Sequence, residues 1–459
     1  MKITKLFLLL VVTIILLPGC STKNTLTSTP SLSPSITRSV TPPPSQTGTV
    51  TPTSQPPSLT PTPTRQPLAI TPTPTPLQTA TPSTTASPLQ TATPKTFVNQ
   101  CLEVATSLPQ NSKSSGVIVL YDYFSASPLY LLDMKTGKQT TLPQIEGENI
   151  ESLVVSPDGK WLAYWSNRNR PAQVTLKNSW LVIATSDGKP YKLVPWQDGW
   201  RSVAGWLDQE RVLVTRMPKK QYDPDSLVVV NPFSGEQVEF TPDYLYFNRS
   251  DWVDWNLSRM VFDPTLTRVI YTSFGEKLTA IALRDVNNKQ LIASVPASLT
   301  CSPQPQWSVD GKQVFLTGLT SEKAWKAGSC NQELYSISRD GESTRLTYFT
   351  DAYTKVGIGS FSLSPDGQKI AFWLWLEANR VEQLATLDLA TGEVTNTCVP
   401  GFSYGQAGPP TWSPDSQQLA VQNLNDDQNH SHTILVDLAQ GWAARFAENL
   451  KPAGWMVSP

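Results

Sequence analysis

The feature that most constrains the fold is a short motif that returns along the chain. Residues 156–164 read SPDGKWLAY and residues 364–372 read SPDGQKIAF. Related copies occupy residues 308–316 and 413–421, and degenerate copies occupy residues 206–212 and 263–269. Proline presets φ at the second turn position, aspartate bonds to nearby backbone, and glycine accepts a positive φ. Because an apolar strand follows each turn, each copy predicts a β-hairpin.

The spacing of these copies predicts the architecture. We call the residue directly before each turn the ruler residue, and the ruler residues are Val155, Trp206, Phe262, Trp307, Leu363, Trp412 and Trp455. A second hairpin follows each first one, as in residues 384–387, which lead through Gly392 into another strand. Two hairpins per roughly fifty residues make a four-stranded unit, and a repeated unit of this kind is a propeller blade.

The repeat motifs resemble those of a known family. The pattern W-S-P-D-G-x-x-[IL]-A-[FY], followed by L-x-x-x-D-x-x-T-G, resembles the β-propeller repeat of TolB and the propeller domain of prolyl oligopeptidase relatives. The resemblance covers about residues 116–459. It implies an all-β, TolB-like and WD40-like propeller. It implies little about function, because such propellers bind, gate or scaffold.

The two ends of the repeat region predict how the propeller closes. The first blade, which begins near Gly116, has sequence for only three strands. Residues 453–455 read AGW, as residues 204–206 do, and the chain then stops at Pro459. We therefore expect the C-terminus to supply the missing strand, which gives seven blades. This number departs from the resemblance to TolB, which implies six blades. Closure hides the strand edges, so we expect a monomeric propeller.

The N-terminus reads as an export signal over residues 1–20. Lys2 and Lys5 precede an apolar run at residues 6–17, which is too short to span a bilayer. The run ends in Leu-Pro-Gly-Cys20, which resembles the lipobox of bacterial lipoproteins. The resemblance implies acylation of Cys20 and an extracytoplasmic protein that is lipid-anchored to the bacterial cell envelope. A plain secretory signal with a coincidental cysteine is the alternative.

Residues 21–97 predict a disordered stalk, and residues 98–459 the propeller domain. The stalk is rich in threonine, proline and serine, and it has too little apolar surface to offset chain entropy. Six basic residues of 36 precede Glu103, but none of the 37 acidic residues does, so the remainder carries 30 basic and 37 acidic residues. Since nucleic-acid binding needs a basic patch, we expect no nucleic-acid partner.

The sequence predicts no catalytic residue, metal site or cofactor. Its two histidines, His430 and His432, fall in or beside a polar loop, and a closed zinc site needs four ligands. A serine nucleophile needs a base, usually histidine, and the sequence has only these two histidines. The turn aspartates Asp158, Asp310 and Asp366 are expected to be structural, as is Asp415.

The cysteines predict disulfides. With Cys20 acylated, four cysteines remain, an even number in an oxidising compartment. Cys301 and Cys330 flank the first hairpin of one blade and should lie on one face of the propeller, so they form the favoured pair. Cys101 is then left to Cys398. Four reduced thiols are the alternative.

Aromatic residues in the loops between blades are the candidate ligand-binding residues. Aromatic side chains supply large, rigid contact areas at binding sites. Packing between blades is the alternative explanation for them. The candidates are Trp196, Trp200, Tyr246, Trp252, Trp255, Tyr353 and Tyr404.

The predicted function is binding of a protein or carbohydrate ligand by a non-catalytic propeller on a membrane-anchored lipoprotein. An exported enzyme that cleaves polysaccharide or peptide with carboxylates in the propeller channel is the alternative. The scarcity of histidine favours the binding protein. We expect the binding loops to lie at the end of the blades opposite the Ser-Pro-Asp-Gly turns, because specificity is normally placed on variable loops of a repeated scaffold.

Overall fold

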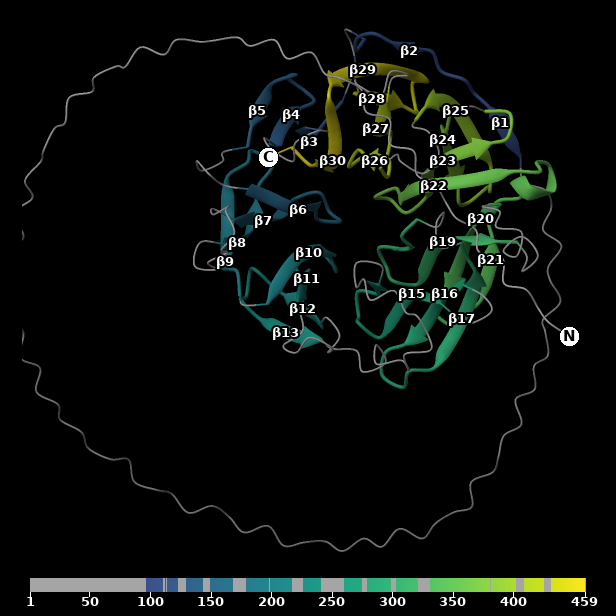
Figure 1. Cartoon of the computed structure of the whole chain (residues 1–459). Coiled ribbons are helices and arrows are strands. Elements are labelled where there is room, and N and C mark those ends of the chain that lie inside the picture. The colour runs from purple at the N-terminus through teal and green to yellow at the C-terminus, as the bar shows by residue number, and fades with distance from the viewer. Residues whose placement is uncertain are drawn as a thin grey trace, which may run out of the picture. The chain divides into compact units, whose positions relative to one another are not determined.

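The structure is a computed structural model of the chain (Figure 1). It describes residues 96–109, 112, 114–122, 129–142, 149–167, 179–197, 199–216, 226–240, 260–274, 279–298, 303–320, 331–379, 381–401, 408–424 and 431–458. These residues form an all-β domain of seven sheets with one 3-10 helix, η4 (Phe349–Asp351). Among them, no helix is long and apolar enough to cross a membrane.

The sheets are the seven blades of a propeller (Figure 1). Within each blade the four propeller strands are antiparallel, and innermost strands of neighbouring blades contact one another, as those of blades 1 and 2 do. The strands are given from the inside outward. Blade 1 consists of β30 (Leu450–Met456), β3 (Val117–Asp122), β4 (Leu129–Asp133) and β5 (Gln139–Thr141), and blade 2 of β6 (Asn149–Val155), β7 (Leu162–Asn167), β8 (Ser179–Ala184) and β9 (Pro190–Pro195). Blade 3 consists of β10 (Trp200–Trp206), β11 (Val212–Arg216), β12 (Ser226–Val230) and β13 (Gln237–Phe240), and blade 4 of β14 (Val261–Phe262), β15 (Arg268–Phe274), β16 (Thr279–Asp285) and β17 (Leu291–Pro296).

Blades 5 to 7 follow the same plan. Blade 5 consists of β18 (Gln306–Trp307), β19 (Gln313–Leu319), β20 (Gln332–Ser338) and β21 (Ser343–Arg345), and blade 6 of β22 (Val356–Leu363), β23 (Lys369–Leu376), β24 (Gln383–Asp388) and β25 (Val394–Pro400). Blade 7 consists of β26 (Thr411–Trp412), β27 (Gln418–Leu424), β28 (Ser431–Asp437) and β29 (Trp442–Glu448). The seven-bladed propeller predicted from the repeat is confirmed.

The first hairpin of a blade is held by side chains of its own motif. Ser156 Oγ donates to Asp158 Oδ1 over 2.7 Å and accepts from the backbone N–H of Trp161 over 2.9 Å. Asp158 Oδ1 also accepts from the N–H of Lys160. The same bonds recur in the turns that begin at Ser308, Ser364 and Ser413. Gly159 has φ +70°, a conformation that only glycine adopts without strain.

Closure uses both ends of the repeat region. β30 pairs antiparallel with β3, with Val117 opposite Met456 and Ile118 opposite Trp455. The C-terminal strand is therefore the innermost strand of blade 1, whose other strands come from the start of the domain. The predicted closure by the C-terminal strand is confirmed.

Apolar side chains fill every boundary between blades. Strand residues alternate between two faces, and both faces are covered by neighbouring blades. In β3, Val117 and Val119 pack toward blade 2, whereas Ile118 and Leu120 pack toward blade 7. The described residues form seven such clusters, one at each boundary. This explains why the strands read as nearly continuous apolar runs.

An N-terminal segment runs along the outside of two blades, and we call residues 96–109 the strap. β1 (Phe97–Asn99) pairs parallel with β25 of blade 6, and β2 (Val104–Ala105) pairs parallel with β29 of blade 7 (Figure 1). Phe97 packs into the boundary between blades 5 and 6, and Leu102 into the next boundary. Leu108 packs between blades 7 and 1. Phe97 thus belongs to this segment of the propeller, although residues 21–97 were predicted as stalk.

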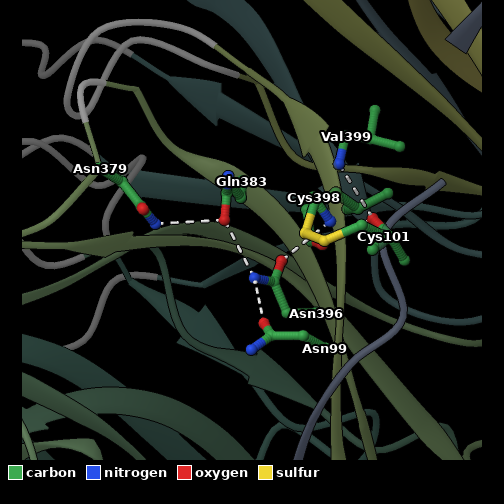
Figure 2. The surroundings of a disulfide bond; sticks show 9 residues. Asn99, Cys101, Asn379, Gln383, Asn396, Cys398 and Val399 are labelled. Carbon is green, nitrogen blue, oxygen red and sulfur yellow. Dashed lines mark hydrogen bonds between the residues drawn. A yellow bond between two sulfur atoms is a disulfide. The ribbon is translucent and has the colours of Figure 1, made fainter. Parts of the chain in front are cut away.

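A disulfide between Cys101 and Cys398 fixes the strap to blade 6 (Figure 2). Cys398 lies in β25 at a register shift relative to β24, and its φ is +57°. The two Cα atoms are 4.7 Å apart. Beside the bridge, Asn396 Nδ2 donates to Asn99 Oδ1 over 3.0 Å and to Gln383 Oε1 over 2.9 Å. Covalent and hydrogen bonds therefore join the strap to blade 6 at the same place.

Candidate binding surface at the channel mouth

Six first turns, and the segment that follows β30 at the C-terminus, each present one residue to a common hollow at the centre of the blades. These residues come two positions after the ruler residues, and all of them line the hollow. We call this set the turn collar, and it comprises Pro157, Asp208, Pro264, Val309, Pro365, Pro414 and Val457. Six of the seven are proline or valine. Every blade therefore contributes one side chain, and all but one are apolar.

The hollow consists of two adjoining cavities of about 660 and about 610 Å³. Both are lined by Pro157, Gln209, Gln306 and Val309, so they share a wall. Val309 is the most exposed large apolar side chain of the described residues, with 57% of its surface accessible. The volumes lie in the range of small-molecule and peptide-side-chain sites.

Tryptophans at ruler positions hold the wall of the hollow rigid. The indole N–H of Trp206 donates to the carbonyl of Val154 on the preceding blade over 3.2 Å. Trp307 and Trp412 make the equivalent bonds to Val261 and Ser362, each over 3.1 Å. Each bond joins the inner strands of two successive blades. The collar is therefore carried on fixed elements, as a binding surface requires.

The charged side chains among the described lining residues are all carboxylates: Asp158, Asp208 and Glu210. Burial raises the pKa of Asp158, but hydrogen bonds from Ser156 and Lys160 outweigh burial, and the pKa lies below its ordinary value. At Asp208, burial also raises the pKa and is outweighed by hydrogen bonds, first from Arg211. A low pKa makes both groups poor general acids at neutral pH. Both carboxylates bond within their own turns, and each is paired with a cation of that turn, Asp158 with Lys160 and Asp208 with Arg211.

Two predicted ligand-binding tryptophans lie in the core. Trp196 and Trp200 are only 4% and 5% exposed, between blades 2 and 3. The ring of Trp196 stacks on Trp165 with centroids 4.8 Å apart, and its Nε1 donates to the carbonyl of Trp200. We therefore correct their assignment, since their rings pack blade against blade, which is the alternative that the sequence left open.

Of the other aromatic candidates, Tyr353 is half-buried and the rest lie outside the described residues. Tyr353 packs at the boundary between blades 5 and 6, and its ring centroid is 6.4 Å from that of Phe97 in the strap. The remaining candidates, Tyr246, Trp252, Trp255 and Tyr404, lie outside the described residues. Their ligand-binding role stays a prediction.

Of the two disulfides predicted from the sequence, the structure shows the one between Cys101 and Cys398. Cys101 and Cys398 are bonded. Cys301 and Cys330 lie outside the described residues, as does Cys20, so their pairing and acylation stay predictions.

The histidines form no metal site in the described part of the chain. His432 is buried in β28 opposite Asn423 in β27, whereas His430 lies outside the described residues. Within those residues, no group of three or more metal-ligating side chains comes together.

The turn collar is not among the sites predicted from the sequence. Those predictions give the turns a structural role and place binding at the opposite end of the blades. A signal was present: the second turn position is proline or valine in six of seven copies. Only the arrangement of the blades shows that these positions converge.

Comparisons with known proteins return structures but no sequence relatives. No protein-family model matches the chain, and no curated protein matches it. TolB from Acinetobacter baumannii is 14% identical with a TM-score of 0.38, over 76% of this chain and 68% of that one. The propeller domain of Cps50 from Myceliophteria thermophila is 12% identical with a TM-score of 0.42, over 68% and 95% of the two chains.

A third similar structure is an oligogalacturonate lyase from Vibrio parahaemolyticus. It is 10% identical with a TM-score of 0.46, over 72% of this chain and 86% of that one. TolB, the family that the repeat motifs resemble, is thus among the structural neighbours. Because every one of these TM-scores is below 0.5, the propeller assignment rests on the sheets of the chain itself, and the neighbours say nothing about its function.

Proposed function

We propose that this chain is a membrane-anchored extracytoplasmic lipoprotein whose non-catalytic propeller binds a protein ligand at the turn collar. One observation carries the binding proposal: side chains from all seven blades, six of them apolar, converge on a shared hollow. Prolines and valines on rigid turns offer apolar contact at little entropic cost, which suits insertion of a polypeptide segment. The proposal of a lipid anchor rests on the sequence of Cys20 and the residues before it.

The binding proposal predicts the effect of a charge in the collar. Val309 is 57% exposed, so Val309→Arg leaves the core intact but places a cation among the apolar collar residues. We expect pull-downs from envelope extract to lose the protein that the parent chain retains, at a cost of about 2 kcal/mol or more in affinity. Val238→Arg is the matched control, because Val238 is 49% exposed on β13, at the outer edge of blade 3.

Several outcomes would contradict the collar proposal. Equal loss of the retained protein in both variants would mean that the site is not at the collar. Retention of the protein by both variants would likewise mean that the site is not at the collar. A glycan array that binds the parent chain, with no protein retained from extract, would favour the carbohydrate ligand. Loss of binding in Trp252→Ala with Trp255→Ala, and not in Val309→Arg, would move the site to the opposite loops.

The anchor proposal predicts the behaviour of Cys20→Ala. Without the thiol, acylation cannot occur, and the protein should remain unprocessed or be released. Radiolabelled palmitate should mark the parent chain and not the variant. If palmitate marks neither and both partition alike into detergent, the lipoprotein proposal is wrong.

A further inference from the structure

A separate cavity of about 200 Å³ lies where the strap crosses from blade 6 to blade 7, and we call it the strap cavity. The strap contributes Gln100 and Leu102 to its lining, on either side of the Cys101 disulfide (Figure 2). The second turn of blade 7 contributes Leu438 and Gly441. Blade 6 contributes only polar residues: Lys369, Thr386, Asp388, Glu393, Thr395 and Thr397.

The sibling blades show that the fold does not need a hydroxyl at Thr386. This residue lies two positions before the first residue of the second turn of its blade. Blade 5 has Ser336 at the same position. The other five blades place an apolar side chain there, and each packs in a boundary cluster: Leu131, Ile183, Val229, Leu283 and Leu435. In blade 6 a hydroxyl therefore replaces the usual apolar group at the boundary that contains the strap cavity.

The hydroxyl of Thr386 is buried but makes no hydrogen bond within the described part of the chain. Thr386 is only 8% exposed and lines the cavity. Thr395 stands opposite it on β25, and its hydroxyl also has no partner among the residues that the structure describes. Thr397, by contrast, donates to the carbonyl of Leu384 over 2.7 Å. Burying a hydroxyl without a partner is unfavourable, so Thr386 favours an occupant that can hydrogen-bond to it.

Lys369 presents a free ammonium group to the same cavity. Asp388 stands opposite it, but no ion pair joins the two side chains in the described structure. In blade 4 the equivalent pair, Arg268 and Asp285, is joined over 2.5 Å. Asp388 is instead held by its own turn, since its Oδ1 accepts from the backbone N–H of Thr391 over 2.8 Å. The cation of Lys369 is therefore available to an anionic group in the cavity.

Glu393 places the opposite charge on the other side of Asp388. The backbone N–H of Asp388 donates to the carbonyl of Glu393, so these two residues also stand opposite each other. The carboxylate of Glu393 has no ion pair or hydrogen bond with another residue of the described ranges. Because neighbouring strands are about 5 Å apart, the backbones of Lys369 and Glu393 are about 10 Å apart. A cation and an anion that flank one cavity without pairing with each other are complementary to a zwitterion.

The size of the cavity restricts the zwitterion to a small one. A volume of about 200 Å³ holds about six or seven groups the size of a water molecule, which takes roughly 30 Å³. A free α-amino acid with a small side chain has a similar number of non-hydrogen atoms. Leu102 and Leu438 supply the apolar part of the lining, against which such a side chain can pack.

We propose that the strap cavity binds a free α-amino acid with a small side chain. Lys369 binds its carboxylate and Glu393 its ammonium group, while the hydroxyls of Thr386 and Thr395 hydrogen-bond to the bound molecule. Its side chain lies against Leu102 of the strap. The proposal is independent of the protein ligand at the turn collar, because the strap cavity shares no lining residue with the hollow.

Calorimetric titration of the purified full chain tests this proposal. The probes are L-alanine, L-serine and L-threonine, and at least one of them should bind and raise the melting temperature. The methyl ester of that amino acid lacks the carboxylate charge, and its N-acetyl derivative lacks the ammonium charge. Each derivative should bind at least about tenfold more weakly, because each loses one charge-assisted contact.

Variants of the two charged residues test their assigned roles. Lys369→Gln copies Gln313 and Gln418, which occupy the same position in blades 5 and 7, so the turn should still form. The affinity for the amino acid should fall at least about tenfold, and Glu393→Gln should lower it to a similar extent. Lys138→Gln is the matched control, because Lys138 is exposed on blade 1 and should leave the affinity unchanged.

A third variant fills the cavity. Thr386→Leu copies Leu131, Leu283 and Leu435, so the blade should fold, which circular dichroism checks. Binding of the amino acid should be lost, whereas the melting temperature without ligand should be equal to that of the parent or higher. If this variant does not fold, Lys369→Gln and Glu393→Gln decide the matter.

The proposal is overturned by any of four results. These are no binding of any of the three amino acids, equal binding of the amino acid and its methyl ester, unchanged affinity in Lys369→Gln, or unchanged affinity in a folded Thr386→Leu variant. Binding of glycerol and of none of the amino acids would assign the cavity to neutral polyols. None of these results depends on whether Val309→Arg affects the protein retained at the collar, so the two proposals fail separately.

Discussion

At the scale of single residues, the aspartates of the turns act as hydrogen-bond acceptors that fix backbone. Asp310 Oδ1 accepts from Ser308 Oγ over 2.7 Å and from the N–H of Lys312 over 3.1 Å. Asp187 is held in the same way by Thr185 and Lys189. The carboxylate form makes these bonds, so the folded state favours ionisation. Their structural role, expected from the repeat, follows from these contacts.

These aspartates predict a loss of stability in acid. The hydrogen bond from Ser308, then Lys312, lowers the pKa of Asp310 to about 2, and Lys189, then Thr185, does the same for Asp187. In an unfolded chain the pKa of aspartate is about 3.9. The stabilisation is thus present above about pH 4 and is lost as pH falls toward about 2. Thermal melting across this pH range checks this, and Asp310→Asn should flatten the decline. A melting temperature that stays constant across the range would contradict the prediction.

The ruler tryptophans predict a cost for losing one indole N–H. Trp412→Phe keeps an aromatic ring but leaves the carbonyl of Ser362 without its donor between blades 6 and 7. We expect a loss of about 1–3 kcal/mol in the free energy of unfolding. Trp442→Phe is the control, because that indole donates to Gln440 at an exposed position and should cost less than about 0.5 kcal/mol. Urea denaturation measures both, and equal effects would refute the bridging role.

At the scale of elements, the strap is the least repetitive part of the propeller. It adds a parallel fifth strand to blades 6 and 7 and places apolar side chains into three successive boundaries. The covered outer strands, β25 and β29, would otherwise present unpaired edges. The strap thus spans the outside of blade 7, the blade next to the closure in blade 1. Its disulfide joins residues that are 297 positions apart.

The disulfide predicts a redox-dependent stability. Cys398→Ser should remove the covalent link between strap and blade 6, at a cost of about 2–4 kcal/mol in the free energy of unfolding. Melting of the parent with and without reductant, beside the variant, measures the effect, and reductant should not affect the variant through this bond. Peptide mapping without reduction should recover Cys101 linked to Cys398, and would test Cys301 with Cys330 in the same run. Recovery of alkylated Cys101 and Cys398 from unreduced protein would contradict the prediction.

At the scale of the whole molecule, closure and the collar depend on the same strand. β30 is the innermost strand of blade 1, and the collar residue Val457 directly follows it. Val457 N also donates to the carbonyl of Gly159 in the first turn of blade 2 over 2.9 Å. The C-terminus therefore completes blade 1, joins it to blade 2 and supplies the last part of the collar.

Deleting residues 450–459 should therefore affect both stability and binding. The deletion removes β30, exposes the inner edge of β3 and opens the boundary clusters on either side of blade 1. We expect a clearly lower melting temperature or aggregation, measured by calorimetry and light scattering. Deleting only Pro459 is the control. A truncated chain that melts like the parent would rule out the shared first blade.

The sequence by itself determined the repeat, and with it most of the fold. Turn residues at fixed spacing dictate hairpins locally, and a blade needs neighbours to bury both of its faces, so seven repeat units with a split first blade lead to a closed propeller. The copy of the ruler motif at Trp455 revealed the closing strand. The even number of cysteines also indicated disulfides, and Cys101 with Cys398, the pair that remains when Cys301 is assigned to Cys330, is the one that the structure joins.

What only the tertiary structure decided depends on contacts between distant parts of the chain. Trp196 and Tyr353 looked alike in sequence as loop aromatics, yet the first is core between blades 2 and 3 and the second lies beside the strap. Burial made the difference, because it depends on which segments the closed ring brings against each loop. The turn collar arose in the same way. Its seven residues, from Pro157 to Val457, meet at one hollow only because the blades are arranged around it, and local sequence carries no record of that meeting.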